Sequence, residues 1–199
     1  MKKILLGTLV ILTSVVMSGC GAAGYSVLPS SKKGVDKDTI VKIDKFEGST
    51  IVQTEKYLIR KGFTDTFPVI LGFKASIKDD KLNNIKIMLE INDTVNRSYN
   101  RALGEDQYKF SFKTIAANNA VASITSSNTN IVGRTAYTTT NTMNIKKNIV
   151  DMYLTYEQLK QIAKKNYSIK IYGATKEGVF EIPQYLTQSF VEKLNTTIK

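Results

Sequence analysis

Regular alternation of hydrophobic and polar residues predicts antiparallel β-strands in the middle of the chain. In the clearest stretch, 67–77, six apolar residues occupy every second position from Phe67 to Ile77. Because successive side chains of a strand point to opposite faces, this spacing is typical of a strand with one buried face. The polar residues Lys78–Lys81, with Asn83 and Asn84, predict a turn, and alternation resumes in 85–95. The two stretches are therefore expected to pair as a hairpin.

Shorter stretches with the same period predict further strands, at 39–46, 50–60, 107–115, 147–154, 167–174 and 177–182. Ala, Asn, Ser and Thr dominate residues 116–144, and two interpretations stay open there. One is a pair of strands, 119–125 and 131–143, joined by a loop at 126–130. The other is a flexible low-complexity loop throughout.

Two helices are predicted near the C-terminus. Thr155 and Gln158 have the spacing of a capping box, and the apolar residues that follow share one helical face. Pro183 suits the first turn of the last helix, in which Leu186, Phe190, Leu194 and Ile198 recur every four residues. The prediction is therefore a strand-rich α+β fold, an antiparallel sheet or sandwich with two helices near the C-terminus.

The first twenty residues have the layout of a secretory signal. Lys2 and Lys3 precede an uncharged, mostly apolar run, 4–17, and small residues then lead to Cys20. The apolar run is shorter than the roughly 20 residues that a membrane-spanning helix needs. Cys20 is the only cysteine of the chain, and it lies where a signal would be cleaved.

The segment Met17–Cys20 resembles the lipobox of bacterial lipoproteins, with Met17 where leucine is usual. The resemblance implies that the Cys20 thiol is acylated, that the bond before it is cut, and that the new N-terminus anchors the protein to a membrane. Gly21, in place of aspartate, favours the outer membrane in a two-membrane organism; otherwise the outer face of the cytoplasmic membrane is expected. An uncleaved anchor and a plain secretory signal are the alternatives.

This pattern divides the chain into a signal peptide, 1–19, a lipidated cysteine with a flexible tether, 20–38, and a single α+β domain, 39–199, that is expected to fold alone. The Pro- and Gly-containing composition of 21–38 favours the tether. About 50 residues of the second half resemble small bacterial lipoproteins of unknown function. They share a capped helix at TYEQLKQIAKK and a strand ending YSIKIYG. This resemblance implies a fold and no activity.

The charge balance is basic, with 28 Lys plus Arg against 17 Asp plus Glu, or +11. Without Lys2 and Lys3 of the signal, 26 basic residues face 17 acidic ones, which leaves +9. Such a surplus attracts anionic partners, of which an anionic glycan is the candidate. Because the lysines are scattered along the chain, a nucleic-acid partner is not favoured, and the composition also fits an AT-rich genome.

The chain has no histidine, and its single cysteine is the expected lipidation site. Histidine and cysteine triads and zinc sites are therefore excluded, and no cofactor or metal is expected. Carboxylates remain, and Asp44, Glu47, Glu90 and Asp93 are the candidates for an acid pair. No catalytic motif supports them, so we expect a protein that is not an enzyme.

Three tyrosines, Tyr99, Tyr137 and Tyr172, fall outside the clearest apolar faces and are candidate surface aromatics. The expected function is that of a lipid-anchored cell-envelope protein acting as a non-enzymatic binding or structural module. Its partners would be the membrane, through Cys20, and another envelope protein or an anionic glycan. The alternatives are an envelope hydrolase that uses carboxylates only, and a surface antigen or adhesin.

Overall fold

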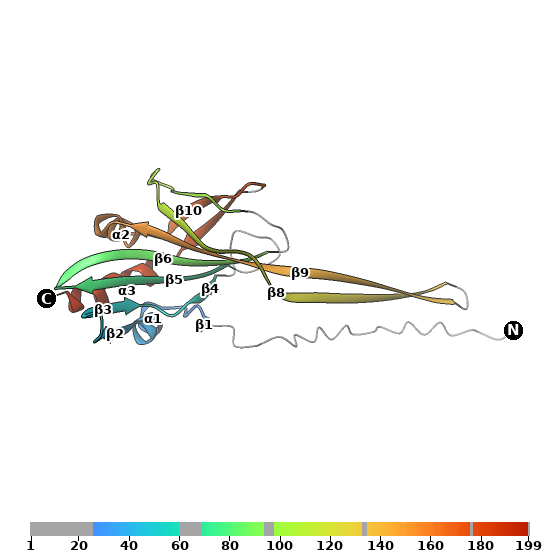
Figure 1. The fold of residues 1–199 in the computed structure, drawn as a ribbon, viewed down its shortest axis with the longest axis horizontal. Helices are drawn as coiled ribbons and strands as arrows, with labels where there is room; N and C mark the ends of the chain where they lie inside the picture. Colours follow the sequence, from blue (N-terminus) through green and yellow to red (C-terminus); the bar gives the residue numbers. More distant parts are fainter. Residues whose placement is uncertain (1–25, 60–68, 94–97, 133–134, 176, 199) are drawn as a thin grey trace.

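The structure is a computed structural model that describes residues 26–59, 69–93, 98–132, 135–175 and 177–198 (Figure 1). Within these residues it contains a large sheet, a small sheet and three helices. The large sheet contains β1 (Ser26–Val27), β2 (Ile40–Asp44), β3 (Ser49–Gln53), β4 (Tyr57–Ile59), β5 (Val69–Lys78), β6 (Lys81–Asp93), β8 (Ser111–Val132) and β9 (Thr135–Leu154). The small sheet contains β7 (Arg101–Gly104), β10 (Tyr167–Tyr172) and β11 (Glu177–Ile182). The helices are α1 (Lys32–Asp38), α2 (Tyr156–Ile162) and α3 (Gln184–Thr197). This confirms the predicted strand-rich α+β class.

The large sheet has the strand order β1–β4–β5–β6–β9–β8, and its strands are antiparallel except for β1 beside β4. Strands β4 and β3 pair with the same edge of β5, β4 with residues 69–71 and β3 with residues 74–78. Strand β2 pairs with the other edge of β3. The predicted β5–β6 hairpin is confirmed, and Asp79 and Asp80 form its two-residue turn. Both have positive φ angles, 51° and 55°, as the turns favoured in such hairpins require.

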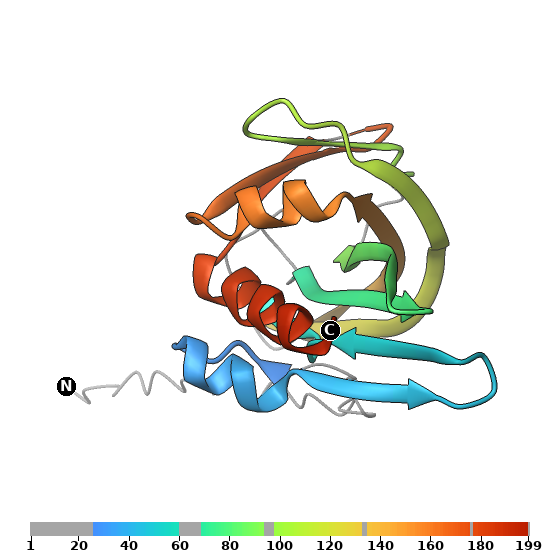
Figure 2. The ribbon, with the colours of Figure 1, turned by 90° about the vertical axis from the view of Figure 1, so that its left-hand side faces the viewer.

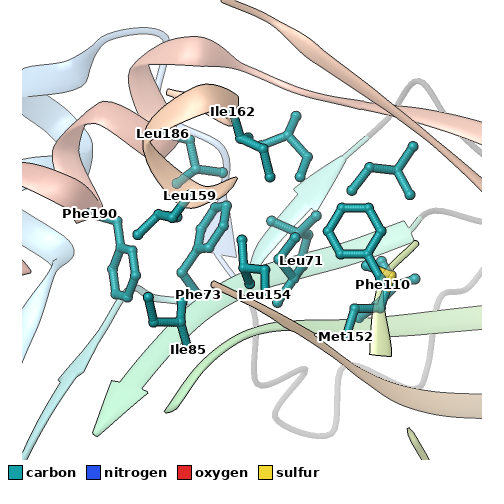
Figure 3. Packing of buried hydrophobic residues seen from close by; sticks show 14 of the residues in the cluster. Leu71, Phe73, Ile85, Phe110, Met152, Leu154, Leu159, Ile162, Leu186 and Phe190 are labelled. Carbon is teal, nitrogen blue, oxygen red and sulfur yellow. The ribbon is translucent and has the colours of Figure 1, made fainter. Parts of the chain in front are cut away.

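The core lies between the large sheet, helices α2 and α3, and the small sheet. Figure 2 shows the two helices inside the curve of the large sheet. Alternate residues of β5, β6 and β9 pack there against the apolar faces of the helices (Figure 3). The sheet contributes Phe73, Ile85 and Met152 to this core, and the helices contribute Leu159, Ile162, Leu186 and Phe190. The hydrophobic alternation therefore identified the buried face of the sheet correctly. No helix within the described residues is long and apolar enough to span a membrane.

The Thr155 cap of α2 is confirmed in part. Its hydroxyl oxygen accepts a hydrogen bond from the backbone N–H of Gln158, 3.1 Å away. A full capping box would also turn the Gln158 side chain back to the N-cap. That side chain instead points to Asp106 and Tyr167, so α2 is joined to the small sheet.

The predicted single strand 50–60 is wrong, because the chain breaks into β3 and β4. Thr54 lies at the break and is fully buried. Its backbone N–H donates to the carbonyl of Phe73, and its hydroxyl accepts from the Phe73 N–H, at 3.0 and 2.9 Å. A Cβ on Gly72 would lie 3.0 Å from the Glu55 carbonyl, so glycine permits this close approach.

The prediction of a flexible tether over 20–38 is wrong where the structure describes that segment. Strand β1 pairs with β4, and α1 packs against α3. Val35 of α1 is completely buried, and Lys32 forms an ion pair of 2.6 Å with Glu192 of α3. A seven-residue helix with one apolar side chain has too little periodicity to be recognised. The domain therefore begins before residue 39; Cys20 lies outside the described residues.

The predicted loop at 126–130 is also wrong, as is the alternative of a flexible loop over 116–144. Strand β8 runs through 126–130, and β8 and β9 pair with each other over the described parts of 116–144, which are 116–132 and 135–144. Ser and Asn suggest a loop by composition, whereas residues 126–130 pair with 137–141 of β9, the strand that follows β8 in the chain.

Candidate functional site

A long two-stranded ribbon projects from the body of the molecule (Figure 1). The pairing of β6 with β9 ends at Asp93 and Lys146. Beyond it, β8 and β9 pair only with each other among the described strands, over eleven positions from Ala122–Ile145 to Val132–Thr135. At about 3.4 Å per residue, the ribbon is roughly 35 Å long. A two-stranded hairpin is marginally stable by itself in water, so a projection of this length requires an explanation.

Small polar side chains pair across the ribbon. The hydroxyl of Ser123 donates to Asn144 at 2.7 Å. Further along, the hydroxyl oxygens of Thr125 and Thr142 lie 3.3 Å apart, and those of Ser127 and Thr140 lie 3.2 Å apart. All six of these side chains are exposed, and so are all five consecutive residues 138–142, which include both faces of β9. Along residues 138–142 of β9, therefore, the body covers neither face.

The edges of the ribbon lack the features that usually block strand pairing. Between Lys113 and Lys146 the sequence has one charged residue, Arg134, and no proline. The register shifts of the β8–β9 pair all lie within 114–122, at the base. Exposed edge strands are normally protected by charges, prolines or bulges, because their free N–H and C=O groups can pair with another chain. The ribbon is therefore a candidate interaction surface.

A second candidate site is a polar cluster at the turn after β7. The Asp106 carboxylate accepts hydrogen bonds from the Tyr167 hydroxyl, from the Gln158 amide at 3.0 Å and from the Tyr108 backbone N–H at 3.1 Å. Gly104 permits this arrangement, because a Cβ at that position would overlap the Tyr167 hydroxyl. The cluster therefore connects the β7 turn, α2 and β10.

The neighbouring acid, Glu105, is also paired. It forms an ion pair of 2.6 Å with Lys165 and accepts a hydrogen bond from the Ser168 N–H at 3.3 Å. Both acids line an open depression of about 510 Å³ together with Gln161, Lys164, Lys165 and Tyr167. No feature of the sequence pattern singled out Glu105 or Asp106, because their partners come from distant segments.

The pKa values of both acids are lowered. Burial raises the pKa of Asp106, but the hydrogen bonds from Tyr167, Gln158 and the backbone lower it by more. The hydrogen bond from Lys165 is the main cause that lowers the pKa of Glu105. Burial, followed by the hydrogen bond to Asp106, raises the pKa of Tyr167. Acid catalysis of glycoside hydrolysis needs a carboxyl group with a raised pKa. Neither acid of the depression has that property.

The acids singled out from sequence do not converge. Asp44 accepts hydrogen bonds from the backbone N–H groups of Phe46 and Glu47 in the β2–β3 turn. Asp44 pairs with Ser49 of β3, and Ser49 in turn pairs with Lys78 of β5. Glu90 pairs with Ile70, which lies eight residues before Lys78 on the same strand. Eight residues along β5 correspond to about 27 Å. Glu90 instead forms an ion pair of 2.8 Å with Lys147, and Asp93 ends β6 beside Lys146 in register.

The three candidate surface tyrosines have different surroundings. Tyr99 is only 4% exposed and belongs to the core cluster, so its prediction as a surface aromatic is wrong. Tyr172 is half-buried, and the Arg101 guanidinium carbon lies 3.9 Å from the centre of its ring. Tyr137 pairs in register with Asn130 on the ribbon, and its side chain is outside what the structure describes.

No protein-family model, curated protein or solved structure matches the chain. Among the residues that the structure describes, no three His, Cys, Asp or Glu side chains are placed to hold a metal ion together. The candidate function therefore depends on the chain's own geometry.

Proposed function

We propose that the protein is a lipid-anchored component of a bacterial cell envelope that acts as a non-enzymatic binding or structural module, with the ribbon as its interaction element. The observation that carries the proposal is the ribbon of eleven paired positions. Its described side chains are exposed beyond Ile145 at the base, and it contains a single charged residue, Arg134. Backbone groups along such an edge bind an added strand without a pocket.

The lipobox at Met17–Cys20 supports the anchored location. Six residue steps separate Cys20 from Ser26, where the described chain enters the large sheet. Even a fully extended segment of that length spans only about 20 Å. An acylated Cys20 would therefore hold the body close to the membrane, whereas the ribbon reaches roughly 35 Å from the body. That reach suits contact with a neighbouring envelope component.

The carboxylates support a non-enzymatic role over hydrolysis. Asp106 and Glu105 are each held by several hydrogen bonds or ion pairs, and both have lowered pKa values. The hydroxyl of Tyr167 and the Gln158 amide connect secondary-structure elements. These contacts suit a structural role, in which the cluster fixes the β7 turn against α2 and β10.

Shortening the ribbon tests the proposal. Ala122 and Ile145 pair directly, so a two-residue Asn-Gly turn can replace residues 123–144 and close the hairpin at its base. The full-length chain with this replacement should remain in the membrane fraction and keep its melting temperature. Its complexes, measured by sedimentation after mild detergent extraction, should be smaller than those of the parent chain.

The matched control is Cys20→Ser in the parent chain, which should leave the membrane fraction while keeping the ribbon. If the parent chain forms no complex, or if the shortened chain forms complexes of the same size, the ribbon is not the interaction element. If Cys20→Ser stays in the membrane fraction and still incorporates labelled fatty acid, the lipid anchor is wrong.

A further inference from the structure

We infer that the β8 edge of the ribbon pairs with the β8 edge of a second copy of this chain, about a two-fold axis. This inference rests on the proposed function and names the partner of the ribbon as a second copy of the chain. Among the described strands β8 is the last of the large sheet, and only β9 pairs with it. Two copies joined in this way would form a continuous four-stranded sheet, β9–β8–β8–β9.

The sequence of β8 is compatible with pairing to itself. In a two-fold interface, residue i of one copy faces residue j of the other, and j faces i. A charged residue near the axis would therefore meet its own copy, and like charges on facing strands are destabilising. Residues 114–133 contain no charged residue and no proline. Any register within this segment thus avoids both obstacles.

The charge of the body favours this antiparallel arrangement. The chain without its signal carries +9, and only Arg134 of that charge lies between Lys113 and Lys146. An antiparallel pair of ribbons places the two basic bodies at opposite ends, separated by about the ribbon length of 35 Å. That distance exceeds the Debye length of about 8 Å at physiological ionic strength. Side-by-side pairing of β8 with β9 of the next copy would instead bring the bodies together.

The pairing also supplies enough contacts for a specific interface. An overlap of eleven residues gives about one backbone hydrogen bond per residue, close to the roughly 10 direct hydrogen bonds of a typical protein interface. It also converts a two-stranded ribbon, which is marginal in water, into a sheet of four strands.

Cysteine scanning tests the pairing in the full-length chain in isolated membranes. Single cysteines are placed at each position from 120 to 130 of β8, with mild oxidation and a non-reducing gel as the readout. Facing residues near the two-fold axis have Cβ atoms close enough for a disulfide. We expect a covalent dimer at one or two neighbouring positions, with the yield falling on both sides.

Two controls accompany the scan. The parent chain, in which Cys20 is the only cysteine, should give no dimer. Single cysteines at 138–142 of β9, of which Thr140 is the partner of Ser127 across the ribbon, should give far less dimer than the best β8 position. If no β8 position gives a dimer, or if β9 positions give as much, the β8 pairing is wrong.

Charge exchange at one position separates this inference from the proposed function. A lysine variant and an aspartate variant, each made without the added cysteine at the position that gives the most disulfide dimer, should each reduce the dimer measured by sedimentation, and co-expression of the two variants should restore it. If the lysine variant removes a complex with a different protein and co-expression does not restore the dimer, the self-pairing is wrong while the ribbon remains the interaction element. If neither variant changes any complex, both proposals are wrong.

Discussion

The aromatic rings of Phe73 and Phe190 stack with their centres 5.2 Å apart and their planes 23° from parallel. Phe73 belongs to β5, at the centre of the large sheet, and Phe190 belongs to α3. Both side chains are completely buried. The pair therefore holds the C-terminal helix against the sheet, and its removal should weaken the whole domain.

Phe190→Ala is expected to lower the free energy of unfolding by about 3 to 5 kcal/mol, because it removes a buried aromatic ring and leaves a cavity. Urea denaturation of the purified protein measures this loss. Thr196→Ala, on the exposed side of the same helix, is the control and should change stability by no more than about 0.5 kcal/mol. Equal losses in the two variants would mean that α3 is not part of the core.

Removal of residues 26–38 should destabilise the domain. A chain beginning at residue 39 loses Val35, whose burial contributes about 1.5 to 3 kcal/mol, together with the Lys32–Glu192 ion pair. It should therefore melt at a lower temperature than a chain beginning at residue 26. The double variant Val35→Ala with Lys32→Ala in the longer chain should reproduce part of the loss. Identical melting temperatures of the two chains would contradict this prediction and place the start of the domain at residue 39.

Gly104→Ala should destabilise the protein by about 1 to 3 kcal/mol, the usual cost of forcing extra volume into a packed site. The added Cβ would overlap the Tyr167 hydroxyl and lie 2.7 Å from the ring carbon that carries it. Combined with Tyr167→Phe, the cost of Gly104→Ala should be smaller than in the parent chain, because the nearest atom is gone. A double-mutant cycle in urea measures this coupling, and strict additivity would contradict the contact.

The Asp106 cluster should make stability fall in acid. The pKa of Asp106 is lower in the folded protein than its ordinary value of 3.8. The stabilisation from its ionised form is therefore fully present above that value and is lost as the pH falls through the folded pKa. Asp106→Asn should be less stable than the parent chain at pH 6, and the difference should narrow between about pH 5 and pH 3.

The control for this pH dependence is Tyr167→Phe, which removes a hydrogen bond that lowers the pKa of Asp106. Its melting temperature should also approach that of the parent chain as the pH falls over the same range. A constant difference at all pH values, in both variants, would show that Asp106 does not contribute to the acid dependence.

Local periodicity in the sequence was enough to predict the central hairpin, the α+β class and the two C-terminal helices. Strands β5 and β6 carry an apolar residue at every second position because that face is buried, and α3 repeats its apolar residues every four positions for the same reason. The Thr155 cap was also predictable, since the bond to Gln158 lies within one helical turn. These features depend on residues that are neighbours in the chain.

Only the tertiary structure decided the rest. Helix α1 is fixed by one buried valine and by ion pairing to α3, far away in the sequence. Tyr99 is buried, although no local pattern indicates it. The Asp106 cluster joins three separate segments, and the ribbon is a strand pair because β8 and β9 pair in register from Ala122 to Val132. Local sequence encodes which face of an element is apolar, whereas pairing between distant segments is set by the free energy of the whole fold.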